Sequence, residues 1–293
     1  MNSFRPALLV VFVLCLFFAA CGSIQQSSSS SSSSPGQPIT PHQPLPKPIQ
    51  PPPVGLQFDN VEDNPGMAGW STCVIDGCHG GTPGGEYPPS SYSLSNGNTQ
   101  ISCSGSSAVL TETSANVQGA AYSNILAYYK AGSHDSENSF TVSFCFYLSG
   151  TINEAEFDTF QFNKAKNTEF MWGTQCVAGG DWDIWNQKTV QWVSLGSSVP
   201  CTLTFNAYHN LSKTMHWDPS DTGNCDGQIC MYFDSIVLDG NTICEPCGSP
   251  QPSGVLPTGW GSDTGIQFQL DITDANKTGT MYIDEADLAE YDN

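Results

Sequence analysis

Residues 154–161, Glu-Ala-Glu-Phe-Asp-Thr-Phe-Gln, place three carboxyl groups at alternate positions: Glu154, Glu156 and Asp158. In a β-strand, alternate side chains point to one face and lie about 6.5–7 Å apart. Carboxylates held on one face repel each other, so they are exposed, share protons or bind a cation. A pair of carboxyl groups is also what hydrolysis of a glycosidic bond with retention of configuration requires. This stretch is therefore the first candidate for catalysis or ligand binding.

Four tryptophans, Trp172, Trp182, Trp185 and Trp192, follow within 21 residues, interleaved with carboxylates and amides. Sugars present C–H faces that stack on indole rings, and their hydroxyl groups need carboxylate and amide partners. We expect two of the four indoles to fill the core, and Trp182 and Trp185, set among polar residues, to be exposed. The candidate ligand-binding residues are Gln161, Trp172, Asp181, Trp182, Trp185 and Asn186.

Two weaker patterns concern metal binding. Residues 274–285, Asp-x-Asn-x-Thr-Gly-x5-Glu, match a calcium-binding loop. The flanking segments alternate like strands, so we expect a β-hairpin that turns at Thr278-Gly279. His209, His216 and Asp218 fit no metal or base motif, and we expect them to be structural. The sequence therefore predicts no cofactor and no metal centre, with a structural calcium ion as the alternative.

Composition and charge narrow the class of partner. The 293 residues include 8 Lys+Arg and 28 Asp+Glu, for a formal net charge of -20. Such a chain repels phosphate backbones, which excludes a nucleic-acid partner. Apolar residues make up 39% of the chain, enough to fill a core, so the acidity does not indicate disorder. We expect a monomer.

The N-terminus predicts export. Residues 1–5 hold one positive charge and precede an apolar run of 14 residues, Ala7–Ala20. That run is short for a membrane span but suits a secretory signal. It ends in Phe-Ala-Ala-Cys-Gly, which resembles a bacterial lipobox with Cys21 as the acylated (palmitate-bearing) residue, although Phe18 replaces the usual Leu. The alternative is an ordinary cleaved signal peptide with a chance cysteine.

A serine run at residues 27–34 and a proline-rich segment at residues 35–53 follow. Neither buries apolar surface, so the first predicts a flexible tether and the second a stiffer spacer. We expect a signal peptide at 1–20, a disordered lipid-anchored linker at 21–55 and one folded domain at 56–293. This organisation predicts a lipoprotein of the bacterial cell envelope, held outside the cytoplasm, that meets the membrane only through its anchor.

Ten cysteines fall within the expected domain, and an even number in an exported chain predicts five disulfides. The alternative is a zinc site built from the last four of them. Spacing favours three local bridges and two longer ones: Cys73–Cys78, Cys225–Cys230, Cys244–Cys247, Cys103–Cys145 and Cys176–Cys201.

The pattern of the domain is that of an all-β protein. A weak helical period occurs only at Val117–Tyr129. Turn residues separate nine strand-like segments, which predicts a two-sheet jelly-roll sandwich stapled by disulfides. These segments are Ala108–Thr113, Ser139–Leu148, Glu156–Asn163, Thr168–Trp172, Lys188–Val193, Cys201–His209, Cys230–Leu238, Gly265–Ile272 and Gly279–Leu288.

The C-terminal half resembles the concanavalin A-like lectin/glucanase sandwich. The resemblance lies in Tyr232–Gly240, Trp260, Ile266–Asp271 and Met281–Glu285. From about Trp70 onward, the chain more narrowly resembles a set of uncharacterised secreted bacterial proteins of that fold. The narrower pattern includes Trp70-x2-Cys73-x4-Cys78, Glu156-Phe157-Asp158-x2-Gln161-Phe162, Trp172-Gly173-Thr174-Gln175-Cys176, Trp182-Asp183-x-Trp185-Asn186, Trp192 and Pro200-Cys201.

The strand at 154–161 also resembles the Glu-x-Asp-x-Glu or Glu-x-Asp-x-x-Glu strand of laminarinase-type retaining glycosidases. The resemblance implies Glu156 as nucleophile and Asp158 as its helper. The position of the acid/base holds Phe160 or Gln161, and an amide does not protonate a leaving group. Gln161 still offers hydrogen bonds to a sugar hydroxyl.

These observations favour a cell-surface lipoprotein that binds a glycan in a cleft lined by aromatic and carboxylate side chains. The alternative from the enzyme class is a polysaccharide-degrading enzyme, a retaining glycoside hydrolase or a lyase, that uses Glu156. A structural envelope protein without a ligand is the third hypothesis. The absence of a second paired carboxyl group in the strand favours binding over catalysis.

Overall fold

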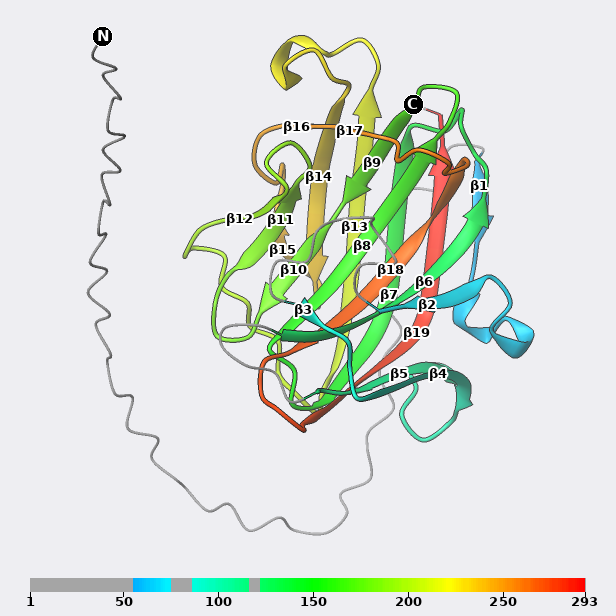
Figure 1. Cartoon of the computed structure of the whole chain (residues 1–293), viewed down its shortest axis with the longest axis vertical. Coiled ribbons are helices and arrows are strands. Elements are labelled where there is room, and N and C mark those ends of the chain that lie inside the picture. Colours follow the sequence, from blue (N-terminus) through cyan, green and yellow to red (C-terminus); the bar gives the residue numbers. More distant parts are fainter. Residues whose placement is uncertain (1–54, 75–85, 116–121, 293) are drawn as a thin grey trace, which may run out of the picture. The chain divides into compact units, whose positions relative to one another are not determined.

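The computed structural model describes residues 55–74, 86–115 and 122–292, shown in Figure 1. The expected signal peptide, the lipidation site Cys21, the linker up to residue 54 and Cys78 lie outside these residues. In the described part, helices are limited to three-residue turns at Val61–Asp63, Pro65–Met67 and Gly223–Cys225, and none is long and apolar enough to cross a membrane.

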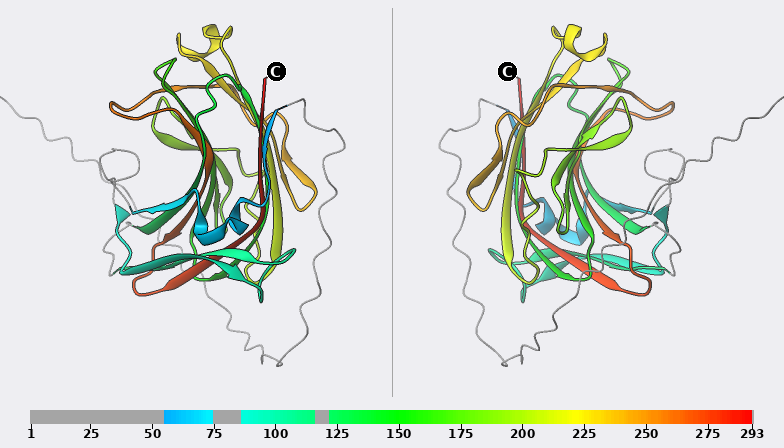
Figure 2. Two further views of the ribbon diagram at one scale, coloured as in Figure 1. Left: turned by 90° about the vertical axis from the view of Figure 1, so that its right-hand side faces the viewer. Right: turned by 90° about the vertical axis from the view of Figure 1, so that its left-hand side faces the viewer.

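The described domain is a sandwich of two sheets, which Figure 2 shows packed face to face. This confirms the predicted all-β, two-sheet fold. All strand pairs are antiparallel except β3 with β6. Sheet A runs β15 (Asn241–Cys244), β14 (Cys230–Leu238), β13 (Tyr208–Asp218), β7 (Ser139–Gly150), β19 (Thr278–Tyr291), β5 (Ser107–Thr113), β4 (Ser91–Asn98), with β1 (Leu56–Phe58) beside β19 and β16 (Gln251–Pro252) beside β14.

Sheet B carries the residues singled out by the sequence. Its central strands, β8 and β18, pair over nine residues in register, which fixes the position of every side chain on their two faces. Sheet B runs β12 (Gln191–Ser194), β11 (Trp182–Asn186), β10 (Thr174–Val177), β8 (Glu154–Asn163), β18 (Asp263–Ile272), β6 (Tyr122–Gly132), β2 (Trp70–Cys73), with β9 (Thr168–Trp172) beside β8, β17 (Gly254–Val255) beside β9 and β3 (Glu86–Tyr87) beside β6.

Aromatic rings from both sheets fill the space between them. Phe144 and Phe146 of β7 meet Phe157 of β8 with ring centroids 5.3 and 4.8 Å apart, and Phe144 meets Phe268 of β18 edge-on at 4.9 Å. Such contacts add to the stabilisation from buried apolar area. Because Phe157 points into the core, the even-numbered residues of β8 point to the opposite side, which we call the outer face of sheet B.

The connection between β18 and β19 differs from the expected hairpin. β18 belongs to sheet B and β19 to sheet A, so residues 273–277 cross from one sheet to the other. The crossing is held by β5, because Ser114 N donates to Lys277 O (2.8 Å) and Lys277 N donates to Ser114 Oγ (3.0 Å). The hairpin prediction was wrong because alternation within two strands does not reveal whether they share a sheet.

Six of the nine predicted strands are confirmed within two residues, and Gly279–Leu288 lies within the longer β19. The strands that were not predicted include β2, β4 and β10. The weak helical segment contains the start of β6, where pairing with β18 determines the backbone. The segment Cys201–His209 is mostly loop, since β13 begins at Tyr208. The segment Lys188–Val193 begins too early, because Asn186 turns the chain into β12, and β11 before it was missed.

Four of the five predicted disulfides are confirmed, and the bonds Cys225–Cys230 and Cys244–Cys247 rule out the alternative zinc site. The longer bridges are Cys103–Cys145 and Cys176–Cys201. Cys73 is also disulfide-bonded, and its predicted partner Cys78 lies outside the described residues. This number of bridges indicates an oxidising, extracytoplasmic compartment.

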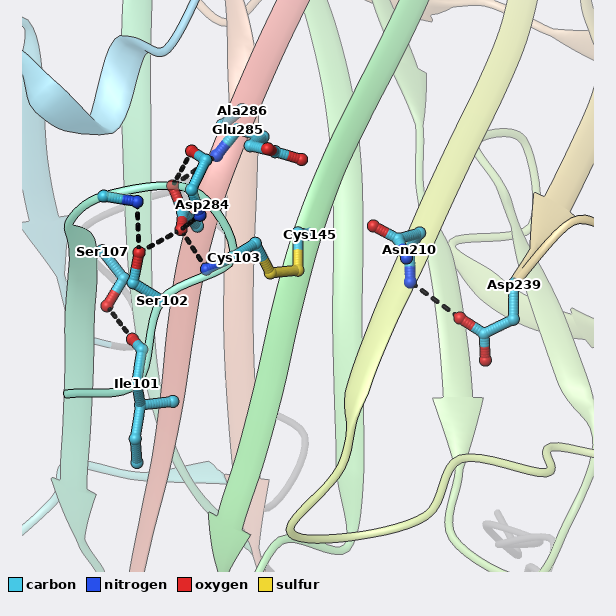
Figure 3. Close-up of a disulfide and its surroundings, with 12 residues drawn as sticks. Ile101, Ser102, Cys103, Ser107, Cys145, Asn210, Asp239, Asp284, Glu285 and Ala286 are labelled. Atoms are coloured by element: carbon cyan, nitrogen blue, oxygen red, sulfur yellow. Dashed lines mark hydrogen bonds between the residues drawn. A yellow bond between two sulfur atoms is a disulfide. The ribbon is translucent and has the colours of Figure 1, made fainter. Parts of the chain in front are cut away.

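A buried carboxylate fastens the loop that carries Cys103, as Figure 3 shows. Asp284 Oδ2 on β19 accepts hydrogen bonds from Ser102 Oγ (2.7 Å), Ser104 N (3.0 Å) and the backbone N–H of Cys103. Asp284 stands at a bulge of β19, where the pairing with β7 shifts register. Disulfide and carboxylate therefore hold the same loop against sheet A.

Several carboxyl groups are buried in the sandwich, and Glu112 of β5 is the clearest case. Its side chain is inaccessible to solvent, its two carboxyl oxygens have no hydrogen-bond partner among the described residues, and burial raises its pKa from 4.5 to about 8. Burial likewise raises the pKa of Glu62 and of Glu290 to about 8. These groups keep their protons in the folded protein at neutral pH.

We predict that the domain loses stability as pH rises from about 4.5 to 8. In this window the unfolded chain releases the Glu112 proton while the folded chain keeps it, so the free energy of unfolding falls by up to about 1.4 kcal/mol per pH unit and proton. Glu112→Gln, which mimics the protonated form, should flatten the dependence measured by urea unfolding at several pH values. An unchanged slope, equal to that of the exposed-site control Glu245→Gln, would contradict this account.

Candidate functional site

The outer face of sheet B carries carboxylates and amides in register across four strands. One row consists of Asp183 on β11, Gln175 on β10, Glu156 on β8 and Gln269 on β18. We call the set of such residues the carboxylate–amide cluster, and strand alternation alone places them together. Its members are Glu154, Glu156, Asp158, Gln175, Asp183, Gln267, Gln269 and Asp271.

The amides of β18 hold the two carboxylates predicted from sequence. Gln269 Nε2 donates to Glu156 Oε1 (2.8 Å), and Gln267 Nε2 donates to Asp158 Oδ2 (2.7 Å). The backbone N–H of Thr174 donates to Asp158 Oδ1 (3.1 Å). Glu156 and Asp158 are only 7% and 5% exposed, and these hydrogen bonds fix the positions of their carboxyl groups on the outer face.

Glu156 has a second carboxyl group beside it that the sequence did not reveal. Asp271 lies one pleat along β18 from the residue opposite Glu156, and the two carboxyl groups are hydrogen-bonded to each other. Burial, and then the charge of neighbouring carboxylates, raises the pKa of both groups well above the ordinary range. The pair therefore holds a shared proton at neutral pH.

Asp158 is in a different electrostatic environment, because Lys213 approaches it from the core. Burial raises the pKa of Asp158 to about 6, and the charge of Lys213 opposes that rise. Lys213 belongs to β13 in sheet A, yet its Nζ donates to the backbone O of Phe157 and to Thr174 Oγ1 (3.3 Å) in sheet B. Burial lowers the pKa of Lys213 to about 8. At neutral pH both groups are charged, Lys213 below the sheet and Asp158 within the cluster.

The other half of the outer face is apolar and hollowed. A cavity of about 420 Å³ has Tyr128, Phe160, Phe162 and Trp260 in its wall. Phe162 stacks on Phe160 and meets Trp260 edge-on, with ring centroids 4.8 Å apart in both cases. Gln267 also lines the cavity, and because this amide donates to Asp158, the cavity and the carboxylate–amide cluster share a border.

Trp185 flanks the cluster on the β11 side. Its ring meets Trp192 edge-on at 5.2 Å, and its Nε1 donates to Gln187 Oε1 (2.7 Å). A Cβ atom on Gly173 would lie 2.8 Å from the Trp185 Cβ and 3.3 Å from Asp158 Oδ1, so only glycine permits this approach. An indole therefore lies against bare backbone next to Asp158.

Three of the predicted ligand-binding residues lie in the core instead. Trp172 and Trp182 are fully buried between the sheets, so the expected exposure of Trp182 was wrong. Gln161 faces inward because β8 has no bulge, and its Oε1 accepts from Trp217 Nε1 (2.8 Å) while its Nε2 donates to His134 O (2.7 Å). None of the three reaches the outer face.

Asp181 and Asn186 stabilise the ends of β11. Asp181 Oδ2 accepts from Ser194 Oγ (2.9 Å), and Asn186 Oδ1 accepts from the backbone N–H groups of Lys188 (3.1 Å) and Thr189 (3.0 Å). These bonds close the turn into β12. The structure thus assigns both residues a local structural role.

The two histidines considered from sequence lie in sheet A and bind different carboxylates. His209 Nδ1 is 2.7 Å from Asp239 Oδ2, and His216 Nδ1 is 2.8 Å from Asp234 Oδ2. Within the described residues, no three His, Cys, Asp or Glu side chains are arranged to hold a metal ion.

Several residues of the outer face were missed at the sequence level. Gln267, Gln269 and Asp271 alternate along β18 in the same way as the carboxylates of β8, so the signal was present in the sequence. Tyr128 and Trp260 gave no such signal, because they reach the cavity from β6 and from a loop that only the fold brings close.

No protein-family model matches the sequence, and no curated protein matches it either. The chain is similar in structure to lectin II from Ulex europaeus (TM-score 0.41, 11% identity, 80% of this chain and 98% of that chain). It is also similar to the alginate lyase Aly36B (0.41, 8%, 68% and 86%) and to a β-glucanase of Bacillus licheniformis (0.39, 8%, 82% and 100%). Lectins and glucanases are the classes named by the sequence resemblance, but at these TM-scores we conclude nothing about ligand or activity.

We predict that Lys213 and Asp158 depend on each other. Lys213→Met removes the positive charge that opposes the rise of the Asp158 pKa, so buried Asp158 loses a compensating charge and the free energy of unfolding falls. The double variant Lys213→Met/Asp158→Asn should recover at least half of that loss in urea unfolding. Additive losses in the double variant would show that the two side chains are energetically independent.

Proposed function

We propose that this protein binds carbohydrate outside the cytoplasm, through the outer face of sheet B. The observation that carries the proposal is the cavity of about 420 Å³, which has Tyr128, Phe162 and Trp260 on its wall and the carboxylate–amide cluster at its border. A sugar ring has two C–H faces and a rim of hydroxyl groups, so it matches an aromatic wall beside polar groups.

The polar rim of the cavity supports this ligand class. Lys130 Nζ pairs with Asp263 Oδ2 at 2.7 Å, and Ser262 and Gln267 complete the rim. These groups include hydrogen-bond donors and acceptors, as recognition of hydroxyl groups requires. Trp185, on the other side of the cluster, extends the aromatic surface along the face, so several sugar units of one chain have partners.

A polysaccharide-degrading enzyme remains the second candidate, because the fold adds a carboxyl group to those of β8. Glu156 is the proposed nucleophile, with Asp158 as its helper and Asp271 as the added acid. Against it, Phe160 occupies the outer-face position of the acid/base. Binding is therefore our first proposal.

The location follows from the N-terminal sequence. We infer a signal peptide at residues 1–20, acylation at Cys21 and a Ser/Pro-rich linker at residues 21–55 that keeps the domain away from the membrane of a bacterial envelope. A lipid-anchored domain of this kind holds glycan at the cell surface. Disulfide bonding of the domain is consistent with that compartment.

We predict that Trp260→Ala weakens binding of the best ligand found on a polysaccharide array. Loss of a stacking indole should cost about 1.5–3 kcal/mol, roughly ten- to hundredfold in Kd by isothermal titration. Tyr92→Ala, at an exposed aromatic of sheet A, is the matched control and should bind like the wild type. Equal affinity of Trp260→Ala and wild type would place the ligand elsewhere.

The glycans that bind in these titrations also serve to test the alternative, enzymatic function. A reducing-end assay on each bound glycan, with wild type and Glu156→Gln, should detect no turnover by either protein. Turnover by the wild type that is lost in Glu156→Gln at unchanged affinity would favour the glycoside hydrolase or lyase, since an amide is not a nucleophile.

We predict that the wild-type protein partitions into the detergent phase and that Cys21→Ser moves it to the aqueous phase. The reason is that the lipid attached at Cys21 is the proposed anchor, and a protein with two or more acyl chains is held stably to a bilayer. Without Cys21 the protein carries no such lipid. Cys15→Ser, in the apolar run, is the control and should stay with detergent. Detergent partitioning of Cys21→Ser would refute the lipobox.

A further inference from the structure

The carboxylate–amide cluster offers far more hydrogen-bond acceptors than donors. Glu156 and Asp158 receive bonds from Gln269 Nε2, Gln267 Nε2 and the backbone N–H of Thr174. Asp158, which is ionised at neutral pH, has room for about four hydrogen bonds and receives two, from Gln267 Nε2 and the backbone N–H of Thr174, so lone pairs remain unused. A ligand that complements the cluster must bring donors.

Gln175 gives independent evidence of a missing donor. Its side chain is 3% exposed, and its Oε1 has no hydrogen-bond partner. β10 places it on the outer face, directly opposite Glu156 on β8 and Asp183 on β11. A buried carbonyl oxygen without a donor is unfavourable, and a donating ligand removes that cost.

Positive charge is scarce around the cluster. Lys130 is the only cationic side chain among the described residues that line the cavity, and Asp263 already neutralises it at 2.7 Å. Lys213 lies below the sheet with its ammonium group bound to backbone and hydroxyl oxygens. The face therefore repels anionic polymers and attracts cationic donors.

The arrangement of the carboxylate–amide cluster and the aromatic side chains suits a polymer better than a single metal ion. The described carboxylates form no group that would hold a metal ion, because they are distributed over β8, β11 and β18. The aromatic wall with Trp260 on one side and Trp185 on the other requires a ligand with apolar faces as well. An amine-bearing sugar polymer combines repeated cationic donors with such faces.

We propose that the ligand is a glycan rich in unacetylated amino sugars, whose ammonium groups donate to Gln175 Oε1 and to the carboxylates around it. The inference deepens the carbohydrate-binding function proposed above and rests on it. Charge-assisted hydrogen bonds between ammonium and carboxylate are about twice as strong as neutral ones, so the amine sets the preference among glycans.

A matched series of ligands isolates the contribution of the ammonium charge to binding. β-1,4-linked oligomers of glucosamine, N-acetylglucosamine and glucose share one backbone and differ at the 2-position alone. We expect the full chain to bind the glucosamine oligomer about tenfold more tightly than the glucose oligomer, by isothermal titration at low salt and pH 7, where Asp158 is ionised. This advantage should shrink as sodium chloride screens the charges.

Two variants test the residues. Glu154→Gln and Asp183→Asn are near-isosteric changes at half-buried positions of the cluster. Each should reduce the advantage of the glucosamine oligomer over the glucose oligomer about threefold. Asp234→Asn, on β14 in sheet A, removes the same charge away from the face and should leave the advantage intact. Equal melting temperatures confirm that all three variants fold.

The outcomes separate the two proposals. Equal affinity for all three oligomers, or tighter binding of an oligogalacturonate, overturns the amino-sugar inference while carbohydrate binding stands. Absence of binding to every glycan overturns both. If calcium chloride alone raises the melting temperature and Asp183→Asn abolishes that rise, the cluster is a cation site and the amino-sugar inference fails. A glucosamine preference that responds to Asp183→Asn but not to Asp234→Asn supports it.

Discussion

The ammonium group of Lys213 connects the two sheets beneath the carboxylates of the outer face of sheet B. It starts from β13 in sheet A, crosses a core of aromatic rings and ends on the carbonyl oxygens of Phe157 and Trp172. A buried charge is tolerated only with partners, and here these include Thr174 Oγ1 and the charge of Asp158. One side chain therefore links β13 of sheet A to the backbone of β8 and β9 and to Thr174 of β10.

The outer face of sheet B divides into a polar and an apolar half because of strand register. Moving along β8, the side chains change from carboxylates at 154, 156 and 158 to phenylalanines at 160 and 162. β18 follows the same gradient, from Asp271 through two glutamines to Gly265 opposite Phe160. Only glycine fits there, because a Cβ atom would lie 2.7 Å from the Phe160 ring and 1.9 Å from the Tyr129 carbonyl oxygen. The Phe160 ring therefore lies against bare backbone and forms part of the cavity wall. Two neighbouring strands thus build a face that offers aromatic and hydrogen-bonding surface side by side.

The carboxyl groups of the outer face differ in their protonation at neutral pH. Burial raises the pKa of the Glu156–Asp271 pair, and a shared proton lets two carboxyl groups stand side by side without full repulsion. Asp158, one pleat away, stays ionised at neutral pH because Lys213 lies beneath it. Neighbouring carboxyl groups of one strand therefore differ in charge, and a cationic donor arriving at the face finds both a charged acceptor and a neutral one.

The sequence by itself determined the all-β class, the positions of six strands and the placement of Glu154, Glu156 and Asp158 on one face, because alternation is a local property. Cysteine spacing favoured the four disulfide pairs that the structure contains, but spacing does not determine a pairing. Tertiary structure decided which face that is and what stands beside it. Trp182 and Gln161 resemble binding residues in sequence but alternate inward, and Asp271 becomes the partner of Glu156 only through the pairing of β18 with β8. Contacts between strands more than 100 residues apart depend on register, which no local pattern encodes.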